Sequence, residues 1–278
     1  MKKINRRSFL AAAGLTAAAL ALTACGGSAS STASSTASSA ASSEAASTSA
    51  AAELTTVEAG KLTMATNAAF PPYEMTTDAG EFEGIDIDTA KAIAEKLGLE
   101  LQIDDMDFDA ALLSVQHGKA DIVMAGVTVT DERKAVMDFS DSYATGIQSI
   151  IVPEGSDITS PDDLAGKKIG TQRGTTGYIY CSDDFGDDAV VAYDDGLTAV
   201  QALNNGQVDA VVIDNAPAKE FVAANPGLVI LDTSYAEEDY AIGLAKGSAL
   251  EDAVNATLEE LKADGTLQSI VDKYITAE

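Results

Sequence analysis

Histidine and cysteine are scarce in this chain of 278 residues, which contains one histidine and two cysteines. His117 has no second histidine with which to share a metal ion, and Cys25 and Cys181 lie far apart in the sequence. A zinc centre, or a Ser-His or Cys-His nucleophile, therefore has few residues to build on. We accordingly expect no metal site, no cofactor and no enzymatic activity, and we expect Cys181 to be a small buried hydrophobic residue.

Positive charge is also scarce. The chain has 17 Lys and Arg against 44 Asp and Glu, which gives a formal net charge of −27 at pH 7. A field of this sign repels phosphates, so nucleic acid is a poor partner. Because no Asp-x-Asp-x-Asp-Gly calcium loop is present, the acidity indicates a solvated surface rather than a cation site.

The N-terminus has the layout of an export signal. A basic region with Lys2, Lys3, Arg6 and Arg7 precedes an apolar stretch, residues 9–23, that is too short for a comfortable membrane span. Leu22-Thr23-Ala24-Cys25 resembles a bacterial lipobox. The resemblance implies removal of residues 1–24 and a lipid on Cys25, which would anchor the mature chain on the outer face of a membrane. Two adjacent arginines leave a twin-arginine signal open beside the general secretory route.

Residues 26–52 consist almost entirely of Ser, Ala, Thr and Gly. Such a stretch has no large apolar side chain whose burial could offset the entropy of ordering. We predict that 25–56 comprises the lipidated cysteine and a disordered tether, which would span roughly 25–30 Å on average. Without the lipobox, a low-complexity spacer with no tethering role would be the preferred interpretation.

The remaining part, about 225 residues, is long enough for one large domain or two small ones. Short apolar runs alternate with helical patterns, which predicts an α/β fold with a largely parallel sheet. The expected strands are 62–65, 99–103, 122–125 and 168–171, and the expected helices are 89–97, 109–116 and 267–274. Ser160 is the expected N-cap of a short helix, and Ser248 with Glu251 is the expected capping box of another.

Residues 116–124 and 204–212 share one pattern: a helix end, a Gly, two further residues, an Asp and a buried strand. Gly126 and Asp214 lie eight residues beyond each Gly, at the carboxyl ends of the two strands. Open α/β sheets bind ligands beyond those ends. The repeat therefore indicates two similar lobes with facing strand ends, although Gly-x-x-Asp before a strand is also a common turn.

Six motifs follow one another along the chain. They are Thr66–Glu74 (TNAAFPPYE), Gly84–Asp88 (GIDID), Ala125–Arg133 (AGVTVTDER), Phe139–Tyr143 (FSDSY), Gly174–Gly177 (GTTG) and Ala210–Asp214 (AVVID). With these motifs, residues 57–278 resemble the extracellular solute-binding proteins of polar amino-acid ABC transporters. The resemblance implies a two-lobed, periplasmic-binding-protein-like fold with two crossover strands as a hinge and a ligand cleft between the lobes. The expected lobes are 57–144 plus 240–278, and 145–239.

The resemblance also implies a ligand site. Arg133 has a planar fork that suits a carboxylate, and Asp214 would take an ammonium group. Thr128 and Thr176 would add hydroxyl or backbone donors, and Gly126 would let the backbone approach the ligand. Because Arg133 and Asp214 belong to different lobes, one dipolar amino acid would bridge them and favour closure.

The side chain of the ligand would meet four further residues. Phe70 and Phe108 would pack on its aliphatic part. Asn67 and Gln172 are neutral hydrogen-bonding groups, which favours a polar uncharged side chain. Arg173 leaves an acidic ligand open if its side chain points inward.

The expected function is that of a monomeric lipoprotein receptor that delivers a polar L-amino acid to a membrane permease with its ATPase subunit. Two alternatives stay open. The fold also resembles periplasmic dehydratases that act on arogenate or prephenate, for which Glu74 is the one candidate proton donor. A sensor ectodomain that acts through a separate signalling partner is the other.

Overall fold

The computed structural model describes residues 54–275. The predicted signal peptide, the predicted lipidation site at Cys25 and nearly all of the predicted tether lie outside the described residues. Within 54–275, no helix is both long and apolar enough to cross a membrane. The description below concerns this part of the chain.

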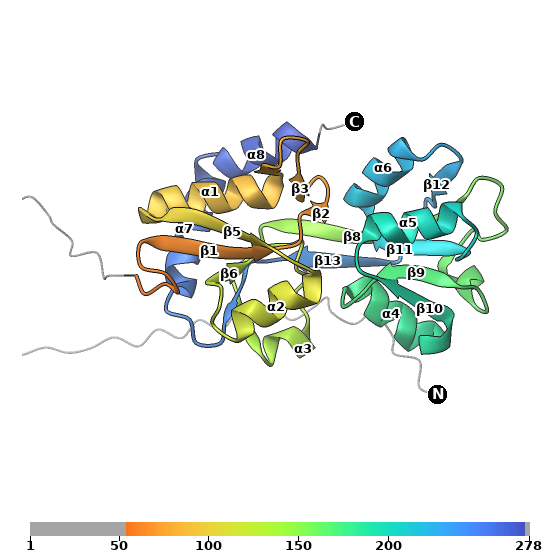
Figure 1. Cartoon of the computed structure of the whole chain (residues 1–278), viewed down its shortest axis with the longest axis horizontal. Coiled ribbons are helices and arrows are strands. Elements are labelled where there is room, and N and C mark those ends of the chain that lie inside the picture. Colours follow the sequence, from red (N-terminus) through yellow and green to blue (C-terminus); the bar gives the residue numbers. More distant parts are fainter. Residues whose placement is uncertain (1–53, 276–278) are drawn as a thin grey trace, which may run out of the picture. The chain divides into compact units, whose positions relative to one another are not determined.

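Two open sheets organise the described residues (Figure 1). The first has the order β5-β1-β6-β14-β7, with β1 Lys61–Thr66, β5 Glu100–Asp105, β6 Ile122–Val123, β7 Met137–Phe139 and β14 Gly243–Ala245. The second has the order β10-β9-β11-β8-β12, with β8 Ala144–Pro153, β9 Ile169–Gln172, β10 Val190–Tyr193, β11 Ala210–Asp214, β12 Leu228–Ile230, and β13 Ala236–Tyr240 paired to β8. Each sheet has a parallel core, β5-β1-β6 and β10-β9-β11.

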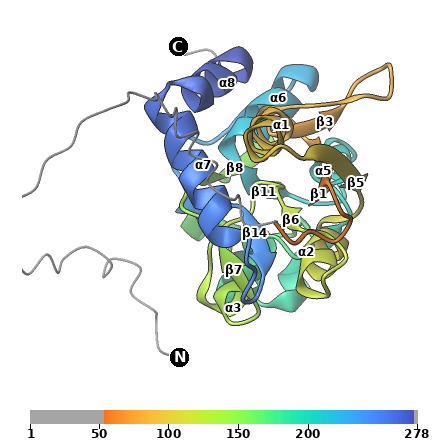
Figure 2. The same cartoon turned by 90° about the vertical axis from the view of Figure 1, so that its left-hand side faces the viewer.

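Helices cover each sheet and define two lobes. The first lobe has α1 Ile85–Leu97, α2 Phe108–Gln116, α3 Asp131–Lys134, α7 Glu251–Ala263 and α8 Thr266–Tyr274. The second has α4 Thr176–Phe185, α5 Gly196–Asn204, α6 Asn215–Ala224 and the short 3-10 helices Pro161–Leu164 and Asp187–Ala189. α1, α7 and α8 pack against one another on one side of the first sheet (Figure 2). A small sheet of β2 Ala69–Phe70, β3 Glu74–Thr76 and β4 Phe82–Glu83 precedes α1.

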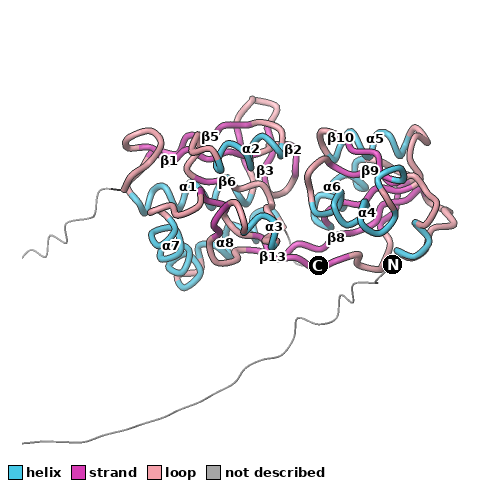
Figure 3. Tube along the Cα trace, turned by 90° about the horizontal axis from the view of Figure 1, so that it is seen from below, coloured by secondary structure: helices cyan, strands magenta, loops and turns pink. Residues whose placement is uncertain are grey.

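Two antiparallel strands connect the lobes. β8 and β13 pair from Ala144 opposite Tyr240 to Gln148 opposite Ala236, and they run together between the two halves (Figure 3). β8 then continues into the second sheet, whereas the chain after β13 enters β14 of the first. The predicted two-lobed α/β fold with two crossover strands is therefore confirmed, while the residue limits of each lobe stay a prediction.

Most predicted elements lie within two residues of the observed ones, but two helix starts were wrong. α1 begins at Ile85, one turn before the expected residue 89, because Gly84 caps it and Asp86 and Asp88 occupy its first turn. The expected capping box of Ser248 does not form. Leu250 takes the N-cap position, and the Ser248 hydroxyl accepts from the Leu250 N–H at 3.3 Å.

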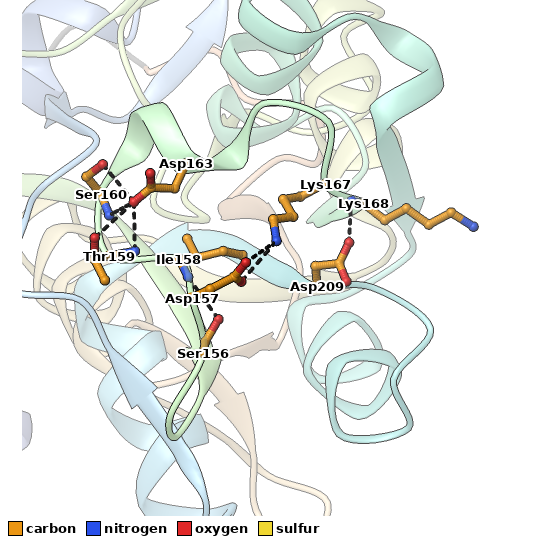
Figure 4. Close-up of polar contacts among 9 residues, drawn as sticks. All are labelled: Ser156, Asp157, Ile158, Thr159, Ser160, Asp163, Lys167, Lys168 and Asp209. Carbon is orange, nitrogen blue, oxygen red and sulfur yellow. Dashed lines mark hydrogen bonds and ion pairs between the residues drawn. The ribbon is translucent and has the colours of Figure 1, made fainter.

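The expected N-cap at Ser160 is confirmed. Its hydroxyl and backbone N–H are both bonded to one carboxylate oxygen of Asp163 at 3.0 Å (Figure 4). The helix that follows begins with Pro161, whose missing N–H leaves one fewer donor to satisfy at the helix start. Cys181 is completely buried in the core of the second lobe, as expected.

The internal repeat has a structural counterpart in its two aspartates. Asp209 accepts the Lys168 N–H at 2.8 Å just before β9 (Figure 4). Asp121 accepts the Thr63 N–H at 2.8 Å within β1. In each lobe, a carboxylate at the start of one strand thus fixes the register of its parallel neighbour. The two units end at facing positions, Gly126 after β6 and Asp214 at the end of β11.

Gly146 in the β8 crossover gives a test of hinge packing. A Cβ atom at this position would lie 2.5 Å from Cζ and 2.6 Å from Oη of Tyr240. Gly146→Ala should lower the melting temperature by roughly 2 to 10 °C, since overpacking costs about 1–3 kcal/mol. The matched control is Gly170→Ala, whose Cβ would lie no closer than 3.2 Å to its neighbours. A melting temperature of Gly146→Ala equal to that of the parent would contradict this packing of Tyr240 on Gly146.

Candidate functional site

One closed cavity lies where the two lobes meet. It is lined by Asn67, Phe70, Glu74, Phe108, Ala125, Gly126, Thr128, Arg133, Gln172, Thr175, Thr176 and Asp214. All nine residues predicted from the sequence to contact a ligand are among them, although their binding roles stay predictions. Asn67, Gln172 and Asp214 lie at or just beyond the carboxyl ends of β1, β9 and β11, where open α/β sheets place ligands. The cavity volume is only about 10 Å³, which leaves no room for an amino acid in this arrangement of the side chains.

Arg133 brings a buried positive charge to the cavity. It lies in α3, whose N-cap Thr130 accepts the Arg133 N–H at 3.1 Å, and it is only 8% exposed. Its guanidinium donates to the carbonyl oxygens of Thr128 at 2.8 Å and of Gly174, in the other lobe, at 3.1 Å. Within residues 54–275, no carboxylate forms an ion pair with it. Burial lowers the pKa of Arg133, because the buried cation has lost water and has no direct counter-ion in the described chain to replace it.

Asp214 brings a buried carboxyl group from the second lobe. It occupies the N-cap position of α6 but makes no capping hydrogen bond. Its carboxylate instead accepts from Gln148 Nε2 at 2.8 Å and from the Tyr240 hydroxyl. Burial, with Glu238 nearby, raises its pKa to about 7, although the two hydrogen bonds favour the ionised form. The side chain of Asp214 is thus not used to cap α6, and it lines the cavity instead.

Thr128 and Thr176 approach each other across the lobes, with their hydroxyl oxygens 3.4 Å apart. Both hydroxyls donate to Oε2 of Glu238, at 3.1 and 3.0 Å. Thr175, rather than Thr176, caps α4 by accepting the Tyr178 N–H at 3.3 Å. The Thr176 side chain is therefore not committed to the helix end.

Asn67 and Gln172 form a second contact between the lobes. Gln172 Nε2 donates to Asn67 Oδ1 at 2.8 Å, and Asn67 Nδ2 donates to the Met106 carbonyl at 3.0 Å. Both side chains are buried, at 9% and 4% exposure. Gln172 Nε2 also donates to the Asp194 carbonyl at 3.3 Å, so one side-chain bond joins the lobes here and backbone carbonyls take the other amide hydrogens.

Glu74 and Asp86 form a buried acidic pair at the cavity. Glu74 is fully buried, and neither of its carboxyl oxygens has a hydrogen-bond partner within the described chain. Burial and the adjacent Asp86 raise its pKa well above the usual range, which favours the neutral acid. Asp86 accepts the Gly126 N–H at 3.0 Å and, through burial, has its pKa raised to about 6. Gly126 has a φ of 55°, a conformation that favours glycine.

Aromatic rings form the apolar walls. The Phe108 ring lies beneath the guanidinium of Arg133, with its centroid 5.4 Å from Cζ. Phe70 lines the cavity and packs on Tyr73, with ring centroids 6.0 Å apart. Tyr73 does not line the cavity itself but lies between Phe70 and Tyr240.

Arg173 points away from the cavity. More than half of its side chain is exposed, and it lies 3.7 Å from Asp194 at the surface. Three residues behind the cavity were missed from the sequence, namely Gln148, Glu238 and Tyr240. All three lie on the crossover strands. Glu238 lies in the acidic run 237–239, which predicts a solvent-exposed segment. Only its spacing of two residues from Tyr240 on the same strand indicates that its side chain points inward.

Asp214 makes stability depend on pH. The folded state holds the proton up to about pH 7, whereas an unfolded aspartate loses it near pH 4. Ionisation therefore costs folded stability between these values, by up to about 4 kcal/mol. The melting temperature of Asp214→Asn should exceed that of the parent at both pH 5 and pH 8, without added ligand, and the difference should be clearly larger at pH 8.

The matched control for this pH experiment is Asp232→Asn, which removes an exposed carboxylate. This variant should follow the parent at every pH. A difference between Asp214→Asn and the parent that stays constant from pH 5 to pH 8 would contradict the raised pKa.

Comparison with known proteins identifies the family. The family described as "Bacterial extracellular solute-binding proteins, family 3" has a sequence model that matches residues 62–277 of this chain. A probable histidine-binding protein of Neisseria gonorrhoeae is 32% identical over 283 residues, covering 99% of this chain and 98% of the relative. The arginine-, lysine-, histidine-binding protein ArtJ from Geobacillus stearothermophilus superposes with a TM-score of 0.75 at 34% identity, over 78% of this chain and 96% of that one. An ancestral arginine-binding protein bound to glutamine gives 0.75 at 42% identity, over 78% and 99%. The chain therefore belongs to the family 3 bacterial extracellular solute-binding proteins.

Proposed function

We propose that this protein captures a polar L-amino acid outside the cytoplasm and delivers it to the permease of an ABC transporter. The main support is the pair of buried, oppositely charged groups that line one cavity from two lobes, Arg133 and Asp214. A free amino acid has a carboxylate for the first and an ammonium for the second. The names of the relatives, which include histidine, arginine and glutamine, support an amino acid as the ligand class.

The proposed binding cycle follows from the closed cavity. In the open state the lobes, taken as 57–144 plus 240–278 and 145–239, expose Arg133 and Asp214 to water. The ligand carboxylate binds guanidinium donors that the Thr128 and Gly174 carbonyls do not use. Contact with Asp214 then requires the second lobe to approach. Because the ligand binds the closed form better than the open one, it shifts the population toward closure.

The rest of the cavity would recognise the side chain of the ligand. Phe70 and Phe108 supply apolar contact, Gly126 allows close approach of the backbone, and Asn67 and Gln172 supply neutral hydrogen-bonding groups. This composition supports a polar uncharged side chain. The outward position of Arg173 removes the argument for an acidic one.

A thermal-shift and calorimetric screen of residues 54–278 against the common L-amino acids tests the function. A true ligand at 100 times its dissociation constant should stabilise the fold by about 2.7 kcal/mol. An absence of stabilisation by any of these amino acids would contradict the proposal.

Arg133 offers a sharper test. Arg133→Ala should weaken binding of the best amino acid from this screen by at least roughly 100-fold, since it removes a buried charge partner. Arg173→Ala, which removes an exposed arginine, is the control and should bind as the parent does. Retained affinity in Arg133→Ala, measured by calorimetry on a folded sample, would show that the carboxylate binds elsewhere.

We further propose that lipid on Cys25 anchors the mature, monomeric protein to the outer face of the membrane. The sequence at residues 22–25 supports this. Cys25→Ser should move the protein from the membrane fraction to the medium or periplasm, as measured by fractionation and immunoblotting. A Cys181→Ser variant should stay in the membrane fraction.

A further inference from the structure

Glu238 lies behind the cavity on the crossover strand β13 and is only 6% exposed. We propose that Glu238 is a positioning residue that turns the hydroxyl lone pairs of Thr128 and Thr176 toward the ligand ammonium. This inference rests on the proposed function and adds a residue to the same site.

The hydrogen bonds around Glu238 carry the argument. A single oxygen, Oε2, accepts from Thr128 Oγ1 at 3.1 Å, from Thr176 Oγ1 at 3.0 Å and from Gln148 Nε2 at 3.0 Å. In each of these bonds the carboxyl oxygen is the acceptor, and the two hydroxyls and the amide are the donors. All three donors therefore converge on one oxygen of Glu238.

A hydroxyl group has one hydrogen and two lone pairs. Once Thr128 and Thr176 each direct that hydrogen to Glu238, both can offer only acceptors to the cavity that they line. Gln148 Nε2 and the Tyr240 hydroxyl likewise direct their hydrogens to Asp214. The side-chain oxygens at this end of the cavity are therefore acceptors, which suits an ammonium with its three N–H donors.

The same carboxylate also joins the lobes. Thr128 precedes α3 in the first lobe, and Thr176 begins α4 in the second. Both reach Glu238 only when the lobes are together. This set of acceptors is thus completed by closure, which ties recognition of the ammonium to the closed state.

Calorimetry with the tightest-binding amino acid from the screen tests this role. Glu238→Ala should weaken binding by at least roughly tenfold, because the hydroxyls lose the acceptor that orients them. Glu238→Gln keeps a carbonyl acceptor and should recover most of the affinity. Glu237→Ala, which removes the exposed carboxylate next in sequence, should bind as the parent does.

A second probe separates orientation from general damage. The probe is the 2-hydroxy acid with the same side chain, in which a hydroxyl replaces the ammonium. The parent should discriminate strongly against it, and Glu238→Ala should reduce this discrimination by at least roughly tenfold, since the released threonine hydroxyls can then donate to the hydroxyl oxygen.

Each outcome is decisive. Equal losses for the amino acid and the hydroxy acid in Glu238→Ala, or equal affinities in Glu237→Ala and Glu238→Ala, would overturn the role of Glu238. Absence of binding by the parent would instead overturn the proposed function. Circular dichroism melts of each variant identify any that fails to fold. If Glu238→Ala does not fold, the ratio of affinities for the amino acid and the 2-hydroxy acid is measured in Glu238→Gln instead.

Discussion

The structure depends on two charges that are buried in one cavity and held apart. Arg133 has two backbone carbonyls but no carboxylate partner in the described chain, and Asp214 has hydroxyl and amide donors but no cation. Burying a charge without a counter-charge is costly. Direct contact between the two groups would remove that cost, but it would also remove the site. The surrounding hydrogen bonds fix each charge on its own lobe, so that a small dipolar molecule is the natural means of neutralising both.

The crossover strands do more than connect the lobes. β8 contributes Gln148, and β13 contributes Glu238 and Tyr240, and these three side chains contact Asp214, Thr128 and Thr176. Tyr240 can pack over β8 because Gly146 has no Cβ atom. Under the proposed hinge motion, a rotation about this strand pair would change the partners of Asp214 together with the distance between the lobes. The proposed hinge and the proposed binding site would then share the same residues.

The sequence predicted the fold and the residues that line the cavity better than it predicted the residues behind the cavity, Gln148, Glu238 and Tyr240. Strands such as β1 and β11 and helices such as α2 and α7 carry hydrophobic patterns of the right period, so their existence follows from burial alone. The start of α1 could not be predicted from such a pattern, because Gly84 and the buried Asp86 act through contacts with distant segments. Glu238 was missed for a similar reason. Neighbouring acids on both sides hide its alternation, and only the pairing of β13 with β8 turns it inward.

Ligand selectivity follows from how the closed site satisfies its own polar groups. Asn67 and Gln172 bond to each other across the lobes, so a side chain that separates them must replace that bond for both amides. An apolar side chain would leave Asn67 Oδ1 without its donor, whereas a group with both a donor and an acceptor can serve each amide. An acidic side chain would lie in the same cavity as the carboxyl groups of Glu74 and Asp214 with one guanidinium, and an ionised Asp214 opposes it. The proposed preference for a polar, non-acidic amino acid thus rests on two free-energy costs. An apolar side chain would leave a buried polar group without a partner, and an acidic side chain would add a negative charge beside buried carboxyl groups.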